Sequence, residues 1–188
     1  MNTTFPSAPA QAQIVSAPLV ATPEKTFEIF LFPGVLPINS VEEGIRLGNY
    51  TRKMPNITDS TVPLLAARGE MDLIVVKFKE TICRDDRIRL LESEGMEPCE
   101  FSPNYLLGLM IRPDSEMPDG LKNKDIVAVA KPGSPRSHFT SPKGEECLLY
   151  VDRSGDGDRY LDLAPANGGC YVFRTYLAQR MRPKTPPP

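Results

Sequence analysis

The segment MDLIVVKF, Met71 to Phe78, constrains the fold of this chain more than any other stretch. Its four central residues, Leu73 to Val76, form a continuous apolar run with three β-branched side chains. Such a run is typical of a strand that is buried on both faces, because a strand with one solvated face alternates apolar and polar residues. We therefore predict that this segment is a central strand of a sheet.

Three short helices are predicted beside this strand. The first begins with an S-x-x-E capping box, Ser40 and Glu43, in which each side chain satisfies a free backbone donor of the first turn. Gly48 suits the left-handed stop of this first helix. The second helix ends before Gly95, and the third begins where a cap is followed by a first-turn proline, Ser102–Pro103. The predicted helices span residues 40–48, 84–94 and 102–112.

Further strands are predicted at residues 26–32 and 125–130 and in the last third of the chain. There the β-rich runs CLLYV, RYLDLA and CYVFRTYLAQR are joined by SGDGD and PANGG, which are rich in turn formers. This order of elements predicts an α+β fold: a mostly antiparallel sheet with two to three short helices packed on one face, and a C-terminal β-meander. The residues predicted to form one core are Leu73, Val75, Leu91, Leu106, Leu107, Val127, Val129, Leu149 and Leu161.

The length of 188 residues predicts a single domain, which we place at residues 25–181. Residues 1–24 contain few large apolar groups and are expected to form a disordered arm. Residues 182–188 are expected to form a proline-rich tail, since prolines, 20 in the whole chain, are concentrated at its ends and in its loops.

Composition argues against several classes of function. The formal net charge of −2 gives no general attraction to nucleic acid or to anionic lipid, and no apolar run is long enough to span a membrane. We expect a cytoplasmic protein, because the first residues lack the pattern of a signal peptide. The four cysteines have no C-x-x-C spacing and no phosphate-binding glycine motif is present, so we expect no zinc site and no nucleotide cofactor.

The loop DRSGDGD places oxygen-bearing side chains at alternate positions, as a calcium loop does. The candidate metal ligands are Asp152, Ser154, Asp156 and Asp158. However, the closing position of a calcium loop falls on Leu163, and the flanking residues alternate as strands do rather than forming helices. We therefore expect a hairpin turn without a structural metal, and keep weak calcium binding as an alternative.

His138 is the only histidine in the chain, and it lies in a long loop rich in proline and serine, residues 131–144. Catalysis by a cysteine needs a base that activates the thiolate, so His138 with Cys147 or Cys99 is the candidate catalytic pair. Neither cysteine has a recognisable nucleophile motif around it, and small apolar cysteines are ordinarily core residues. No catalytic residue is therefore assigned, and this pair remains a candidate.

Several segments resemble a family of small uncharacterised bacterial proteins. They are LGNY with NIT, VVKF, RLLESEGMEPCEF, YLLGLM, DIVAVA and VFRTYLAQR, within residues 47–180. In this family a helix ending in G-x-x-P precedes a leucine-rich helix, an I-V-A-L strand and a hairpin closing on R-F-L-A-x-R. The chain departs from the family in having no tryptophan near the last hairpin. The resemblance implies a bacterial or phage origin and an α+β fold, and it implies no activity or catalytic residue.

Two classes of function remain after these exclusions. The first is a non-enzymatic protein-interaction module, whose partner is another protein or a second copy of the chain. The second is a small hydrolase or transferase with its site at residues 131–147. The lack of any complete catalytic motif favours the interaction module.

Overall fold

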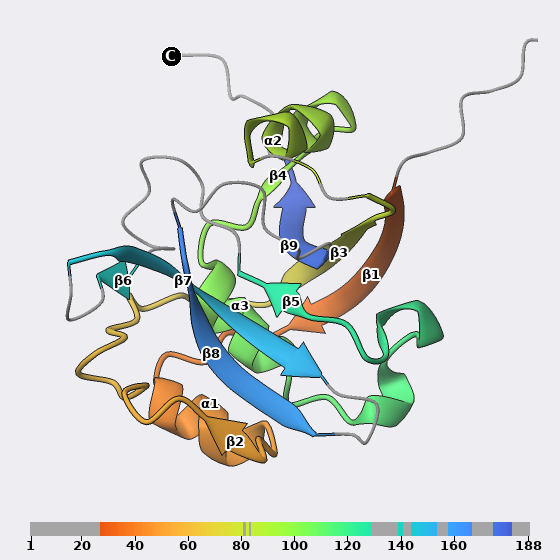
Figure 1. Ribbon diagram of the computed structural model, residues 1–188. Helices are drawn as coiled ribbons and strands as arrows, with labels where there is room; N and C mark the ends of the chain where they lie inside the picture. The colour runs from red at the N-terminus through yellow and green to blue at the C-terminus, as the bar shows by residue number, and fades with distance from the viewer. Residues whose placement is uncertain are drawn as a thin grey trace, which may run out of the picture.

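The computed structural model describes residues 27–80, 82, 84–128, 139–140, 144–153, 158–166 and 175–181 (Figure 1). These residues form three α-helices, α1 (Val41–Leu47), α2 (Arg84–Ser93) and α3 (Ser102–Leu109), and two 3-10 turns, η1 (Asp114–Glu116) and η2 (Asp119–Leu121). The strands are β1 (Phe27–Val35), β2 (Arg52–Lys53), β3 (Met71–Phe78), β4 (Met96–Pro98), β5 (Ile126–Val127), β6 (Phe139–Thr140), β7 (Glu146–Arg153), β8 (Arg159–Pro165) and β9 (Thr175–Arg180).

All nine strands of the described residues belong to one mixed sheet with the order β1-β3-β9-β5-β7-β8-β2. β4 also pairs with β9, and β6 pairs with β7. Among the described strands only the pairs β2–β8 and β5–β9 are parallel, so the predicted α+β class and mostly antiparallel sheet are confirmed. β5 joins the two halves of the sheet although it is only two residues long, because it pairs with β9 on one side and with β7 on the other.

β3 is the segment MDLIVVKF that was predicted to be a central strand, and its bounds agree with the prediction. Leu73 and Val75 point into the main core, whereas Ile74 and Val76 point into a second cluster on the other face of the sheet. Both faces of this strand are therefore buried, as expected. Of the residues predicted to form one core, Leu91 and Val127 belong to the second cluster and Val129 lies outside the described residues; the other six are in the main core.

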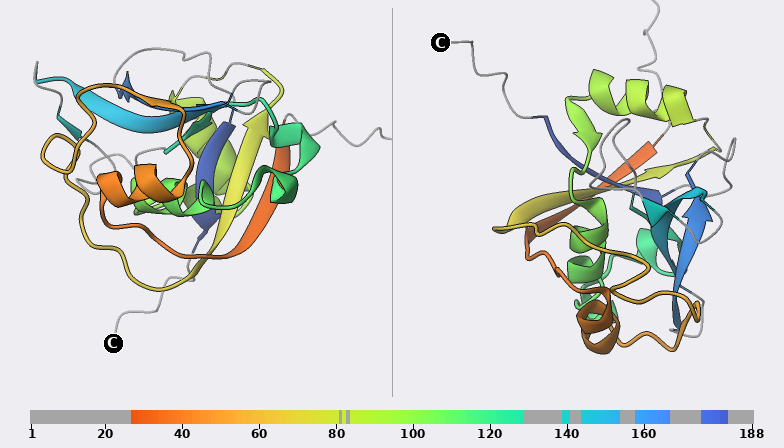
Figure 2. Two further views of the ribbon diagram at one scale, coloured as in Figure 1. Left: turned by 90° about the horizontal axis from the view of Figure 1, so that it is seen from below. Right: turned by 90° about the vertical axis from the view of Figure 1, so that its left-hand side faces the viewer.

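The helices do not share one face of the sheet, contrary to the prediction. The sheet curls so that β7 and β8 lie across from α1 and α3, which fill the main core (Figure 2). α2 lies at the other end of the molecule, where Leu91 packs on the second cluster with Ile74 and Val76 (Figure 2). Because β3 is apolar on both faces, each face needs a cover, and α2 provides one for the second face.

The predicted C-terminal meander is also wrong in its last step. β7 and β8 form an antiparallel hairpin with Arg153 opposite Arg159, but β9 returns to the middle of the sheet between β3 and β5. The physical reason is burial, since residues 175–179 of β9 are all buried. A strand that is covered along its whole length is better placed in the centre of the sheet than beside the half-exposed β8.

Local signals predicted most of the helix ends, but the left-handed stop expected at Gly48 is wrong: its φ is −82°, and its N–H bonds to the Gly44 carbonyl, so α1 ends with a right-handed turn. Ser40 caps α1 by accepting a hydrogen bond from the Glu43 N–H at 3.1 Å, and Gly95 follows α2 with a φ of 70°. The sequence did not predict that Asp59 joins the same cap, where it accepts hydrogen bonds from the Val41 N–H and the Ser40 hydroxyl.

The predicted arm at residues 1–24 and the tail at residues 182–188 lie outside the described residues. Within the ranges that the structure describes, no helix combines the length and apolar character needed to cross a bilayer.

Candidate functional site

The candidate catalytic pair is only partly described, because His138 lies outside the described residues. Cys147 lies on β7 opposite Phe139 of β6, and its side chain is buried. The Cys147 thiol donates to the Glu145 carbonyl at 3.6 Å. A shallow cavity of about 530 Å³ lies beside it, and the described residues that line it are Gly144, Glu145, Glu146 and Pro165. The Cys147 sulfur is therefore not among the described groups that face this cavity.

Cys99 is a core residue. It is buried just after β4, and its thiol points at the Met71 sulfur at 3.8 Å. Burial raises the pKa of the Cys99 thiol to about 12, so the group is protonated at neutral pH. A protonated and buried thiol is a poor nucleophile.

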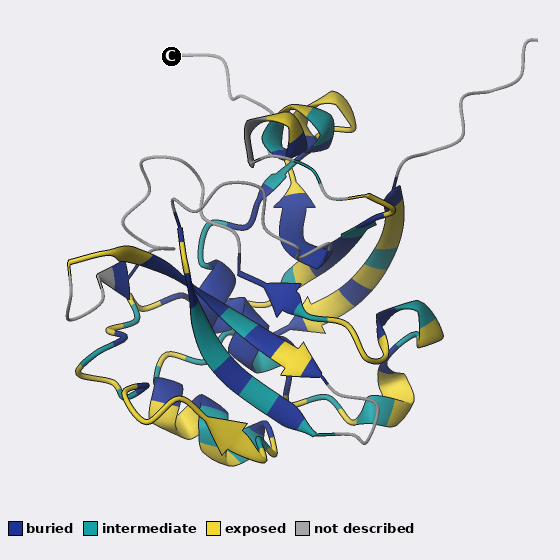
Figure 3. Cartoon of the chain, viewed as in Figure 1, coloured by how far each residue is buried: buried dark blue, intermediate teal, exposed yellow. Residues whose placement is uncertain are grey.

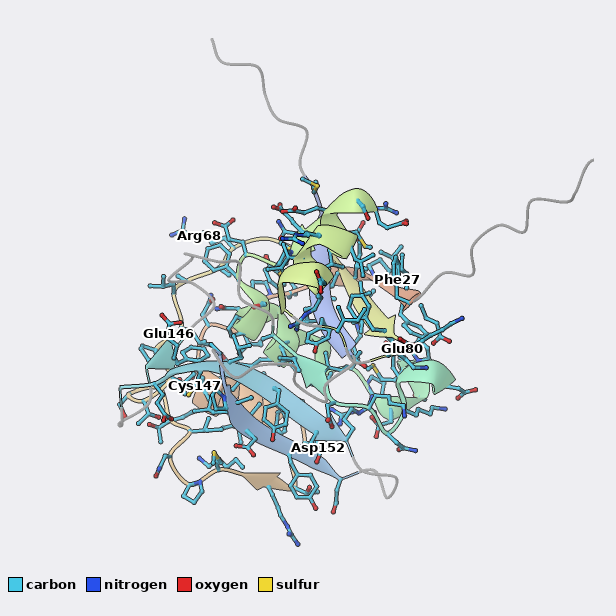
Figure 4. The ribbon with its side chains drawn as sticks, turned by 45° about the horizontal axis from the view of Figure 1, so that its top comes forward. Phe27, Arg68, Glu80, Glu146, Cys147 and Asp152 are labelled. Carbon is cyan, nitrogen blue, oxygen red and sulfur yellow. The ribbon has the colours of Figure 1, made fainter. Side chains whose placement is uncertain are left out.

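Two of the four candidate calcium ligands, Ser154 and Asp156, lie outside the described residues. Asp158 accepts a hydrogen bond from the Tyr160 hydroxyl at 3.2 Å. Asp152 lies near the far end of β7 from Cys147, and both are labelled in Figure 4. The antiparallel pairing of β7 with β8 confirms that SGDGD connects the two strands of a hairpin. Among the described residues, no group of three or more His, Cys, Asp or Glu side chains could hold a metal ion.

Asp152 instead faces Asp125, which precedes β5. Asp125 is half-buried, and its pKa is raised to about 6 by burial, by a hydrogen bond between the two carboxyl groups and by the charge of Asp152. Beside this pair, the Tyr150 hydroxyl donates to Asp162 Oδ2 at 2.9 Å. Asp152 of β7, Asp162 of β8 and Asp125, which precedes β5, thus all lie near the Tyr150 hydroxyl.

The raised pKa of Asp125 predicts an effect of pH on stability. Its folded pKa of about 6 lies above the ordinary value of 3.8, so the stability it contributes below pH 3.8 is lost as pH rises through 6. Asp125→Asn removes the cost of ionisation and is expected to stabilise the protein at pH 8 by at most about 1 kcal/mol, since the group is half exposed. The gain should disappear near pH 4. Urea denaturation at pH 8 and at pH 4 measures this gain in stability, with Asp158→Asn as the control variant. An equal gain for Asp125→Asn at both pH values would contradict the prediction.

A second polar cluster, the arginine clip, consists of Arg153, Arg159 and Asp114. The Arg159 side chain is buried and donates to the carbonyls of Gly48, Met110 and Arg112 and to Asp114 Oδ1 at 2.6 Å. Arg153 also donates to Asp114. The clip therefore ties the ends of α1 and α3 to the start of β8.

The charges of the clip explain the state of Asp114. Burial opposes its ionisation, but the hydrogen bond from Arg159 and the charges of both guanidinium groups outweigh burial and lower its pKa. The arginine clip was not predicted from the sequence. A signal did exist, because Arg153 and Arg159 occupy the same alternation as Val151 and Leu161, which point inward.

The third feature is the outer edge of β1. Within the described part of the chain, β1 pairs only with β3 and ends the sheet on that side. Phe27 and Phe32 are buried, whereas Glu28, Ile29 and Leu31 are exposed, and Figure 3 shows exposed blocks along the strand. Ile29 is 45% exposed and Leu31 is 61% exposed, and Leu36, just after the strand, is 58% exposed. Three of the seven exposed large apolar side chains among the described residues therefore lie within eight positions of each other.

The backbone of this edge is open. Among the described residues, the backbone groups of residues 27–32 make no hydrogen bond outside the pairing with β3. The pairing shifts register between Phe32 and Val35, where the Gly34 N–H bonds to Asp72 and Arg112 donates to the Pro33 carbonyl. The open stretch thus covers Phe27–Phe32 and stops at the proline.

The comparisons with known proteins do not assign a function to any of these features. No family model, curated protein or solved structure matches the chain. The resemblance to the bacterial family stays a prediction.

Proposed function

We propose that this protein is a non-enzymatic protein-interaction module that binds an extended segment of its partner along β1. The observation that carries the proposal is the open edge of β1 with Ile29 and Leu31 exposed on one face. An added strand would satisfy the free backbone groups of Phe27–Phe32, and its alternate side chains would cover the two aliphatic groups.

Edge strands are ordinarily protected by charges, prolines or bulges, because an open edge pairs with any available strand. In β1 the proline and the irregular pairing lie only at its end, at Pro33. The one acidic residue in the open stretch, Glu28, is paired with Lys77 at 2.8 Å. The middle of the strand, Ile29 to Leu31, therefore has none of these protections, which supports a role in binding.

The face that carries Ile29 and Leu31 is also the accessible one. Phe30 and Phe32 point to the opposite face, where both pack on the main core. η2 also lies on that opposite face: a Cβ added at Gly120 would be 2.7 Å from the Phe30 ring and 3.6 Å from the Glu28 carboxylate. A partner strand would thus place its apolar side chains on the face away from η2.

A hydrolase or transferase that uses His138 and a cysteine is less well supported. Cys99 is protonated in the core, and Cys147 is buried with its thiol bonded to a backbone carbonyl. Both thiols are buried, whereas activated thiolates are ordinarily partly exposed beside positive charge.

A labelled peptide of about eight residues, alternating valine and threonine with a lysine at each end, tests strand addition by fluorescence anisotropy. We expect wild-type protein to bind it and Leu31→Lys to weaken binding about tenfold or more, because the lysine removes an apolar cross-strand contact and adds charge. Met54→Lys is the matched control, since Met54 is 45% exposed and follows β2 at the other end of the sheet.

Equal binding of the peptide by the wild type and both variants would contradict the proposal, as would no binding at all. Leu31 is exposed, so Leu31→Lys should fold normally, and an unchanged melting temperature verifies this.

A further inference from the structure

We infer that the strand that pairs with β1 is β1 of a second copy of this chain, related by a twofold axis through Phe30. This inference rests on the proposed function, because it names the partner for the same edge. In such an antiparallel pair, residues at equal distances before and after Phe30 lie opposite each other. Ile29 of one copy therefore faces Leu31 of the other. The sheet would then continue across both copies.

The sequence of β1 is self-complementary in this register. The two exposed large apolar residues of the strand, Ile29 and Leu31, form two identical aliphatic contacts across the interface. Glu28 faces Phe32 of the second copy, so the two acidic side chains are not opposite each other. Directly opposed like charges destabilise a strand pair, whereas aliphatic pairs stabilise it.

Neighbouring registers are poorer. An axis through Glu28 would oppose the two Glu28 carboxylates. An axis through Leu31 would place Ile29 opposite Pro33, which has no N–H and lies where the pairing of β1 is irregular. An axis through Ile29 would place Leu31 opposite Phe27, which is only 6% exposed because its ring already packs edge-on against Phe78. Only the axis through Phe30 places the exposed side chains of Ile29 and Leu31 opposite each other, so that each covers the other.

The resulting dimer is expected to be weak, because one short strand pair and four aliphatic side chains lie at the small end of specific interfaces. We expect a dissociation constant on the order of 10–100 µM. Sedimentation velocity from 1 to 300 µM, a range chosen around that estimate, measures it. Leu31→Lys should raise the constant about tenfold or more, and Met54→Lys should leave it unchanged.

Cross-linking tests the register. Ile29→Cys and Leu31→Cys proteins are oxidised separately and as an equal mixture, and disulfide-linked dimers are followed on non-reducing gels. Opposite residues in a strand pair lie within disulfide reach, whereas diagonal neighbours lie about 7–8 Å apart at Cβ. The mixture should therefore cross-link faster than either variant alone. Wild-type protein is the control for the native cysteines, of which Cys99 and Cys147 are buried.

Three results would overturn the inference. A protein that stays monomeric up to 300 µM, or a dimer that tolerates Leu31→Lys, excludes this edge as the contact between copies. Fastest cross-linking of Ile29→Cys alone excludes the axis through Phe30. The proposed function fails separately, because a monomer that still binds the valine–threonine peptide retains strand addition and only loses the second copy as partner.

Discussion

Arg159→Met should lower the free energy of unfolding by about 3 kcal/mol, because it breaks a buried, charge-assisted cluster. The methionine fills much of the space but leaves the carbonyls of Gly48, Met110 and Arg112 without the donor that satisfies them. These carbonyls end two helices, so α1 and α3 would both lose their attachment to β8. The melting temperature should fall by about 6–12 °C for a chain of this size.

Urea denaturation measures this effect, and Arg46→Met is the matched control. Arg46 lies on α1 with a 70% exposed side chain, at 3.9 Å from the Glu43 carboxylate, so its loss should cost less than about 0.5 kcal/mol. If Arg159→Met were as stable as the control, the arginine clip would not hold the helix ends together.

Gly108→Ala should also destabilise the protein, by about 2–3 kcal/mol, although alanine is the better helix former by about 1 kcal/mol. A Cβ added at Gly108 would lie 1.9 Å from the Leu36 carbonyl oxygen, so α3 would have to move away from the segment that follows β1. Backbone cannot adjust as a side-chain end can, and the close approach of α3 to this segment depends on glycine.

Gly44→Ala on α1 is the control for this prediction. Its added Cβ would approach atoms of the Leu107 side chain at 3.0–3.1 Å, which a small rotation can relieve. Thermal denaturation of both variants should therefore show a clearly larger loss for Gly108→Ala. Equal melting temperatures would mean that α3 packs less closely on residue 36 than described.

The elements with strong local signals were predictable from the sequence. The continuous apolar run of β3, the cap at Ser40 and the glycine after α2 each act within a few residues, so their structural consequences could be read directly. The hairpin of β7 and β8 was predictable for the same reason, since two alternating strands flank a turn-rich segment.

The arrangement of the sheet depends on contacts that are distant in sequence and was not predictable in this way. β9 inserts between β3 and β5 because its side chains are buried on both faces, and only the partner strands show that this is so. The short strands β2, β4 and β6 have two or three residues each, which is too few for any periodicity to appear.

The features of the candidate site were missed for different reasons. The open edge of β1 cannot be seen in the sequence, because TFEIFLF reads as a strand whether or not a neighbour covers its second edge. The carboxyl pair Asp125–Asp152 joins residues 27 positions apart, and only the pairing of β5 with β7 brings them together. The arginine clip could have been suspected from the inward alternation of its two arginines.

Hydrogen–deuterium exchange of β1 tests the claim that this strand is the binding edge most directly. Exchange is compared in dilute protein, in concentrated protein and in dilute protein with saturating valine–threonine peptide. We expect slower exchange of the amides of residues 27–32 in the last two samples, because an added strand accepts hydrogen bonds from the open edge, and no change in α1. Identical exchange of residues 27–32 in all three samples would contradict it.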